Sequence, residues 1–331
     1  MKHYNFGSIT QFRNICKQIK MEAEYQGKDA DGNDVYNPNA PKPTLTFTGT
    51  VKLHGTNAAI VYSKEHGLYA QSRERVLSIE SDNAGFAFYV ESNREYFEKA
   101  YGQALEDQGL DTLIVYGEWA GGNIQKGVGV CNIEKQFYPF LCKHLYKDTE
   151  FSFMPYWGAT PESKEYPITS FPTFTLDIDF NHPEIVQNEL IRITEEVERE
   201  CPVAKAFGHS GIGEGVVWTA NWNGKQYRFK VKGEKHSSSK VKTLASVDTD
   251  KIESCQKFAE YAVTESRFEQ ALQAVFPDGN LDVKQIGALL KWMNTDIIKE
   301  EIDTLVANNL EFKEVAKHIA DATKKRFFER I

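Results

Sequence analysis

The chain has 331 residues, a formal net charge of −8, and a composition that is 41% hydrophobic and 26% charged. These values are typical of a globular protein with about two domains and a substantial core. The net charge argues against a surface coated with cations, but it leaves room for a local basic groove. No apolar run approaches the roughly 18 residues of a membrane span, and the start resembles no signal peptide. We therefore expect a cytoplasmic protein with no membrane partner.

The first predicted element is a helix at residues 8–22. Ser8 can cap it, and its apolar residues share one face. A polar segment at 27–43 follows, with turn-forming residues throughout. Within it, residues 29–34 resemble the start of a calcium loop, but the glycine is misplaced and the twelfth position is Ala40. We expect a surface turn there.

A lysine-containing string, KLHGTN at residues 52–57, comes directly after an apolar, β-prone run at 45–51. A second such run follows at 58–62. A lysine between two strands, with a glycine three residues on, can project its amine while the backbone approaches a ligand closely. Such an amine could attack the α-phosphate of a nucleotide and hold AMP as a phosphoramidate. The short pattern Lys-x-x-Gly is common at solvated strand ends, but the longer string is much rarer.

Two further polar groups follow strand-like runs. Arg73 comes after the second strand-like run, at 58–62, and Glu118 comes after a predicted buried strand at 113–116. A helix is predicted between them at residues 86–104. Taken singly, Arg73 could be a surface arginine and Glu118 a turn carboxylate.

A predicted hairpin carries the next candidates. Its turn is Asn223-Gly224, a strong hairpin signal, and it follows a predicted helix at 184–200. Glu214 opens the hairpin, and Lys230 and Lys232 close it on one side of a strand. The stretch from 225 to 242 carries seven Lys or Arg residues and one acidic residue, Glu234. A solvated face is the ordinary interpretation of such a run, but its position beside this motif favours phosphate contact.

From about residue 248 the apolar spacing becomes helical throughout, with a break at 277–279. We expect a small all-α domain at residues 250–331, joined near 243–250 to a domain at residues 1–243.

The ordered motifs resemble those of the covalent nucleotidyltransferases, which include ligases and capping enzymes. The wider superfamily has an aspartate where His54 stands. The histidine form is similar to the double-strand RNA ligase family, which includes the second RNA ligase of T-even phages and the RNA-editing ligases of trypanosomes. Residues 261–268 and 286–290 also resemble the helical C-terminal domain of the phage enzyme. The resemblance implies an α+β fold: an ATP-grasp-like nucleotidyltransferase domain of antiparallel sheets with flanking helices, plus the all-α domain.

The resemblance also implies an activity: an ATP-dependent RNA ligase that seals 3′-hydroxyl and 5′-phosphate ends, at nicks in duplex RNA. Lys52 would take AMP from ATP and pass it to the RNA. Mg²⁺ or Mn²⁺ would be the cofactor, held by Glu214 directly or through water. We expect RNA and ATP as partners, a monomer, and a phage-encoded protein in a bacterial host.

The roles of the residues follow from the same resemblance. The expected catalytic groups are Lys52, Arg73, Glu214, Lys230 and Lys232. The nucleotide would be bound by these five together with Leu53, Asn57, Glu118 and Phe140. Glu118 takes the ribose in this scheme, and Phe140 stacks on the adenine, although the aromatic cluster at 137–140 could equally be core.

Contacts with RNA are expected from Lys126, Lys225 and Arg267. Lys126 lies in a glycine-containing loop that resembles the ligases, and Arg267 lies in the C-terminal resemblance. At position 219 the phage relative has a lysine where this chain has Thr219. The corresponding phosphate contact is therefore either missing or supplied by Lys225.

Three alternatives stay open. A capping guanylyltransferase would use the same lysine with GTP, although His54 and the helical C-terminus argue against it. A DNA ligase is disfavoured because neither zinc-ribbon cysteines nor an oligonucleotide-binding barrel signal follows residue 242. A nucleic-acid-binding module without catalysis would form no AMP adduct.

Overall fold

The computed structural model describes residues 1–160, 162–236, 255–307 and 310–331. The chain divides into two compact units, Met1–Val231 and Lys232–Ile331. The predicted connection at 243–250 lies outside the described residues, as do Lys240 and Lys242. Each unit is described by itself below.

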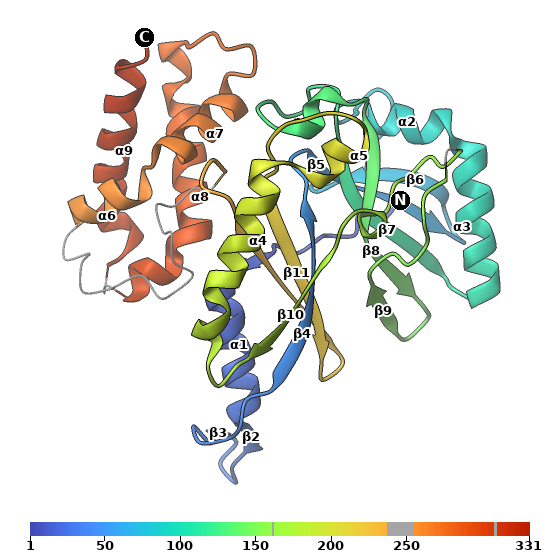
Figure 1. Ribbon diagram of the computed structural model, residues 1–331, viewed down its shortest axis with the longest axis horizontal. Helices are drawn as coiled ribbons and strands as arrows, with labels where there is room; N and C mark the ends of the chain where they lie inside the picture. Colours follow the sequence, from blue (N-terminus) through green and yellow to red (C-terminus); the bar gives the residue numbers. More distant parts are fainter. Residues whose placement is uncertain (161, 237–254, 308–309) are drawn as a thin grey trace. The chain divides into compact units, whose positions relative to one another are not determined.

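The first unit contains a five-stranded antiparallel sheet with the strand order β6-β5-β7-β8-β9 (Figure 1). Its strands are β5 (Thr56–Ser63), β6 (Gly67–Ser72), β7 (Thr112–Ala120), β8 (Gln136–Leu145) and β9 (Glu150–Phe153). One face, here the outer face, is covered by α2 (Phe86–Ser92) and α3 (Arg94–Gln108), whose Phe86 and Phe97 are completely buried. Burying each such aromatic side chain contributes about 2–3 kcal/mol.

The other face of this sheet is the inner face. Its buried side chains are Ala59, Val61, Tyr69, Ile114, Tyr116 and Leu141. They alternate along the strands with those of the outer face, as strand geometry requires. Phe6, from the N-terminal segment, packs onto them. The inner face is therefore covered in part by the start of the chain.

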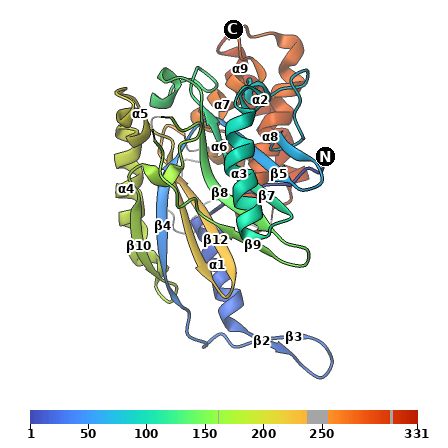
Figure 2. The same ribbon diagram turned by 90° about the vertical axis from the view of Figure 1, so that its right-hand side faces the viewer.

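The second sheet of this unit has the order β1-β12-β11-β4-β10. Its strands are β1 (Thr10–Gln11), β4 (Thr44–Lys52), β10 (Phe174–Asp179), β11 (Gly215–Trp222) and β12 (Lys225–Lys232). Helix α1 (Phe12–Glu24) lies against this sheet (Figure 2). It packs through Phe12, whose ring centroid lies 4.9 Å from that of Phe229. Helix α4 (Gln187–Arg199) lies along β11. The chain passes from this sheet to the first one between β4 and β5.

Short elements complete the first unit. They are the hairpin of β2 (Tyr25–Lys28) and β3 (Asp34–Tyr36), α5 (Pro202–Ala206), and the 3₁₀ turns η1 (Gly129–Asn132), η2 (Ile168–Ser170) and η3 (Pro183–Val186). The predicted surface turn at 29–34 is the connection of the β2–β3 hairpin, closed by a hydrogen bond from the Asp29 amide to the Asn33 carbonyl (2.9 Å).

Two helix predictions need correction. Helix α1 begins at Phe12 rather than near Ser8, because Thr10 and Gln11 pair with β12 and Ser8 does not cap the helix. The helix predicted at 86–104 is divided at Asn93, whose φ of −118° and ψ of 24° are not helical. The Asn93 side chain donates to the carbonyl of Tyr89 (2.8 Å), which is the local competition that makes asparagine a helix breaker.

The second unit is helical, as predicted. It contains α6 (Cys255–Ala262), α7 (Glu265–Val275), η5 (Val283–Gln285), α8 (Ile286–Ala307) and α9 (Phe312–Phe328). Its core includes Phe258, Phe268, Met293, Ile319 and Phe327, all completely buried. Helix α7 ends just before the predicted break at 277–279.

The expected fold class is confirmed: antiparallel sheets with flanking helices, and a C-terminal helical region. The hairpin prediction is also confirmed, since Asn223 and Gly224 have φ values of 49° and 71°, the left-handed pair that a tight hairpin turn uses. None of the helices within the described ranges is long and apolar enough to cross a membrane.

Candidate active site

Lys52 is the last residue of β4, where the chain leaves one sheet for the other. Its Nζ donates to Oε2 of Glu214 over 2.6 Å, and Nδ1 of His54 lies 3.4 Å from the same oxygen. Glu214 is almost enclosed, with 3% of its side chain exposed, whereas the side chains of Lys52 and His54 are each 21% exposed. The structure therefore brings together one predicted nucleophile and one predicted acidic group.

Gly55 allows the backbone to approach the first sheet closely. Its amide donates to Oε1 of Glu118 over 3.0 Å. A Cβ at this position would lie 2.4 Å from the carbonyl oxygen of Trp119, so any other residue would force the backbones apart. This explains the glycine three residues after Lys52: it fixes the lysine turn against the strand that carries Glu118.

Glu118 lies on β7 directly opposite Asn57 of β5, and both side chains point to the inner face. Burial raises the pKa of Glu118 to about 7, opposed by Lys52 and reinforced by the negative charge of Glu214. A weaker opposing contribution comes from Arg73. Glu118 is therefore electrostatically coupled to three other predicted site residues.

Arg73 follows the end of β6 and is 40% exposed. Its Nη2 donates to Oγ of Ser8 over 3.1 Å, and Nε lies 3.8 Å from the carboxylate of Glu74. The guanidinium is thus held from one side by the N-terminal segment while part of it stays open to solvent. Leu53, by contrast, is 5% exposed and belongs to the core.

Two aromatic residues of β8 face the inner side near Glu118. Phe140, the predicted adenine platform, is half-buried and packs against the ring of Phe6 at 5.1 Å between centroids. It occupies a bulge, because the pairing with β7 skips from Leu141 to Pro139. Tyr138 is directly opposite Glu118 and completely buried. From the sequence, Tyr138 was placed only within the aromatic cluster at 137–140, and its position opposite Glu118 becomes visible only in the strand register of the structure.

Lys230 and Lys232 alternate on β12 with the buried residues Phe229 and Val231, so both lysines lie on the side of the strand away from α1. Gln11 of β1 pairs with Lys230. The alternation expected from the sequence is therefore present, and it gives one side of this strand a positive charge.

The three residues predicted to contact RNA differ in their exposure to solvent. Lys126 is exposed in the loop after β7. Lys225 is 63% exposed at the start of β12 and pairs with Glu22 over 3.0 Å. Arg267 is completely buried in the second unit.

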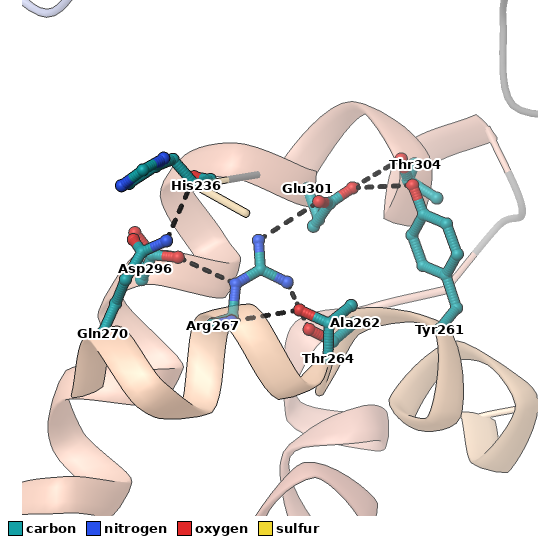
Figure 3. Close-up of polar contacts among 9 residues, drawn as sticks. All are labelled: His236, Tyr261, Ala262, Thr264, Arg267, Gln270, Asp296, Glu301 and Thr304. Atoms are coloured by element: carbon teal, nitrogen blue, oxygen red, sulfur yellow. Dashed lines mark hydrogen bonds and ion pairs between the residues drawn. The ribbon is translucent and has the colours of Figure 1, made fainter. Parts of the chain in front are cut away.

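Among the described residues, Arg267 contacts other residues of the second unit (Figure 3). Its Nε donates to Asp296 over 2.8 Å, Nη2 donates to Glu301 over 3.2 Å, and Nη1 donates to the carbonyl of Ala262. These partners belong to α8 and to the end of α6, so the guanidinium ties three helices together. An RNA phosphate has no access to it, which contradicts the predicted RNA contact.

The acidic groups near Lys52 fit a hydrated divalent cation better than a caged one. Within the described ranges, no group of three or more His, Cys, Asp or Glu side chains is arranged to hold a metal ion. Glu214 supplies carboxylate oxygens, the ligands that Mg²⁺ and Mn²⁺ prefer. Mg²⁺ commonly keeps several waters and uses one or two carboxylates together with substrate phosphates. The residues present therefore fit such an ion, with Glu214 as the carboxylate next to Lys52.

Comparison with known proteins identifies the family. The sequence profile of the RNA ligase family matches residues 45–232, more than half of the 331 residues. The chain therefore belongs to the RNA ligase family. The matched range includes Lys52, Glu118, Glu214 and both lysines of β12.

Solved structures of an RNA ligase from Naegleria gruberi are similar. The complex with pyrophosphate has a TM-score of 0.43 and 16% identity, covering 70% of this chain and 56% of that chain. A mutant with ATP and manganese has a TM-score of 0.43 and 16% identity, covering 70% of this chain and 56% of that chain. A mutant with AMP and manganese has a TM-score of 0.42 and 16% identity, covering 69% of this chain and 55% of that chain. This chain thus matches just over half the length of those structures. A search of curated protein sequences found no match.

Proposed function

We propose that this protein is an ATP-dependent RNA ligase that joins 3′-hydroxyl and 5′-phosphate ends, at nicks in duplex RNA. The observation that carries the proposal is the setting of Lys52. Its amine lies at the crossing between two sheets, 2.6 Å from an almost enclosed carboxylate, within the segment that matches the RNA ligase family. A lysine so placed suits covalent catalysis.

In the first step the Lys52 nitrogen attacks the α-phosphorus of ATP. The new N–P bond forms as the bond from that phosphorus to the bridging oxygen breaks, and pyrophosphate leaves with the electron pair. The amine must first lose a proton and release its hydrogen bond to Glu214, which holds it in place at rest. Mg²⁺ or Mn²⁺, held by Glu214 directly or through water, would neutralise charge on the phosphates.

Glu118 suits a ribose contact because its pKa is raised to about 7. Near neutral pH its carboxyl group is protonated in a substantial fraction of molecules, so it can donate a hydrogen bond to one hydroxyl oxygen. One oxygen is already oriented by the amide of Gly55 (3.0 Å). Asn57, directly opposite in the register, would contact the phosphate or the hydrated metal. For the adenine we propose the half-buried Phe140.

Cationic side chains would bind the phosphates of ATP and of the RNA. We propose that Lys230 and Lys232 stabilise charge on the α-phosphate and on the leaving pyrophosphate. Arg73, partly open to solvent, would meet the phosphate of AMP or the 5′-phosphate of the RNA. An oxygen of that 5′-phosphate then attacks the phosphorus of the Lys52-bound AMP, and the N–P bond breaks as the lysine nitrogen keeps the electron pair. A 3′-hydroxyl oxygen, which loses its proton to solvent, then attacks the RNA 5′-phosphorus, and AMP leaves with the electron pair as the phosphodiester bond forms. Positioning and charge stabilisation supply the catalysis.

The RNA itself would be held by exposed cations such as Lys126 and Lys225, and its binding should weaken as salt rises. We propose that the helical unit binds RNA, but through surface residues rather than through the buried Arg267. Its monomeric state, cytoplasmic location and phage origin stay predictions of the sequence.

The decisive experiment is intact-protein mass spectrometry after incubation with ATP and Mg²⁺, followed by peptide mapping. We expect a mass increase of one AMP group, located on Lys52, and no increase with GTP. Labelling by GTP alone would indicate a capping-type enzyme, and an adduct on another side chain would refute the proposed mechanism. Sealing of matched nicked RNA and nicked DNA duplexes then tests the substrate: faster sealing of DNA would contradict the RNA assignment.

A further inference from the structure

Side chains from β6 and the residue after it hold the N-terminal segment along the inner face. Tyr69 donates from its hydroxyl to the carbonyl of Lys2 (2.8 Å), and Arg73 donates to Oγ of Ser8 (3.1 Å). Between them, Gln71 binds Tyr4. Residues two apart on a strand share a face, so these three contacts follow one line along the strand. The N-terminal segment therefore runs beside the edge that carries Arg73.

Gln71 is the central contact. Its Oε1 accepts from the amide of Tyr4 (3.0 Å), and its Nε2 donates to the carbonyl of the same residue (2.6 Å). Gln71 is 1% exposed, so both of its polar atoms are satisfied inside the protein. The Tyr4 carbonyl also accepts from the hydroxyl of Tyr116 (3.2 Å). A buried amide with two backbone contacts fixes the segment closely, because breaking either one leaves a buried polar group unsatisfied.

Phe6 extends this attachment to the second sheet. Its ring is 7% exposed and packs on Tyr116 and Phe140 of the first sheet, at 5.2 and 5.1 Å between centroids. The guanidinium carbon of Arg228, on β12 of the second sheet, lies 4.7 Å from the centre of the same ring. One side chain from the N-terminal segment thus contacts strands of both sheets.

The segment then joins the second sheet as a strand. Thr10 pairs with Phe229 and Gln11 pairs with Lys230, in parallel. Residues 2–8 are therefore attached along β6 as far as Arg73, and residues 10–11 are attached beside Lys230. These are two of the cations to which we assign phosphate contacts, and they come from different sheets.

We propose that residues 2–11 form a positioning strap that sets Arg73 and the Lys230 strand relative to each other, and that Gln71 is its principal positioning residue. The proposal rests on the proposed function. Misplacing a phosphate-binding group by about 1 Å is enough to lower a rate about 100-fold. Loosening the strap should therefore slow AMP transfer to Lys52 while leaving the binding of ATP nearly unchanged.

The test is a double-mutant cycle on single-turnover formation of the Lys52 adduct. Gln71→Leu removes both contacts with little change in volume, and we expect a rate loss of about 10- to 100-fold with a KM for ATP within about threefold of wild type. In an Arg73→Ala background the same change should cost less than about threefold, because the strap would have lost the group it positions. Equal losses in both backgrounds would overturn the proposal.

Thr194→Val is the matched control. Thr194 is 3% exposed on α4 and donates to the carbonyl of Leu190 over 2.7 Å, so its replacement also removes a buried hydrogen bond, away from the strap. We expect its adduct rate to stay within about threefold of wild type. A loss equal to that of Gln71→Leu would show that general destabilisation, rather than positioning, lowers the rate.

A second pair of variants decides the question if Gln71→Leu does not fold. Ser8 is exposed, so Ser8→Ala should leave the fold unchanged while slowing adduct formation about three- to tenfold. Ser8→Thr keeps the hydroxyl and should restore the rate. A rate for Ser8→Ala equal to that of wild type would refute the strap. The wild type is measured first: a wild type that forms no adduct refutes the proposed function, whereas an active wild type with additive losses refutes the strap alone.

Discussion

Two regions of the molecule place a cation against buried or partly buried carboxylates, and the two cations differ in exposure and in their number of contacts. In the candidate active site, Lys52 is 21% exposed and donates to one oxygen of Glu214. In the helical unit, Arg267 is completely enclosed and binds Asp296, Glu301 and a backbone carbonyl. We propose that the partly exposed Lys52 exchanges Glu214 for a substrate, whereas the completely buried Arg267 stays bound to its partners. Exposure and the number of contacts are the structural differences between the two cations.

The largest effect on activity is expected from the first region. Lys52→Ala removes the nitrogen that forms the bond to phosphorus, so no AMP adduct should appear in intact-protein mass spectra. Lys52→Arg is the matched control, because it keeps the positive charge beside Glu214 but is not a usable nucleophile. Both variants should be inactive. An adduct on either one would place the reaction elsewhere in the chain.

The largest effect on stability is expected from the second region. Arg267→Met leaves two carboxylates without their cation, and breaking a buried ion pair in this way costs about 3–5 kcal/mol. Denaturant unfolding measures the loss. Because the nucleophile belongs to the other unit, Arg267→Met should still form the Lys52 adduct at a temperature where it is folded.

A combined variant sharpens this prediction. Replacing Asp296 and Glu301 by leucine together with Arg267→Met removes the whole ion cluster, and such replacements often recover the lost stability. We expect the triple variant to be more stable than Arg267→Met alone. A triple variant that is less stable would mean that the cluster does more than balance its own charges.

The two regions also show which features the sequence could predict and which it could not. KLHGTN and Asn223-Gly224 are local patterns, and the turn after Lys52 and the hairpin are both present as expected. The role of Gly55 was only partly visible, because the close approach to Trp119 depends on a strand 64 residues further along the chain, as their numbers show. Local spacing predicts an element but not what packs against it.

Arg267 shows the same limit of prediction from local sequence, here for a residue that was assigned a function it does not have room for. Its neighbours in the sequence resemble a nucleic-acid-binding helical domain, and an arginine there suggests a phosphate contact. Its partners Asp296 and Glu301 lie on another helix, and nothing in the local sequence identifies them as partners. Ser8 was misassigned for a similar reason: the pairing of Thr10 and Gln11 with β12 delays the start of the helix.

An intermediate effect is expected from Glu118. Burial raises its pKa from the usual 4.5 to about 7, so the folded protein holds this proton more tightly than the unfolded chain does. Stability therefore falls as pH rises from about 4.5 to about 7 and changes no further above that range. Glu118→Gln should be more stable than wild type by roughly 3 kcal/mol at pH 8 and nearly equal to it at pH 4, in denaturant titrations. It should also lose most adduct formation.

Glu165 supplies the matched control for that experiment. Burial raises its pKa to about 7 as well, and its carboxylate accepts from the hydroxyl of Tyr101 over 2.5 Å, outside the candidate site. Glu165→Gln should show the same pH-dependent gain in stability but keep its activity. Parallel loss of activity in both variants would mean that Glu118 has no special part in the reaction.

The smallest effect on stability is expected where a cation is neither reactive nor enclosed. Lys225 is 63% exposed and pairs with Glu22 over 3.0 Å, so Lys225→Ala should change the free energy of unfolding by less than about 1 kcal/mol. If Lys225 contacts an RNA phosphate, its loss should still weaken RNA binding and lower the slope of log affinity against log salt by about one. Lys64→Ala is the control, because Lys64 is 56% exposed and pairs with Asp111, also over 3.0 Å, at the end of β5 remote from Lys52. Equal salt slopes for the two variants would exclude Lys225 from the RNA-binding surface, since exposed ion pairs alone would then account for both.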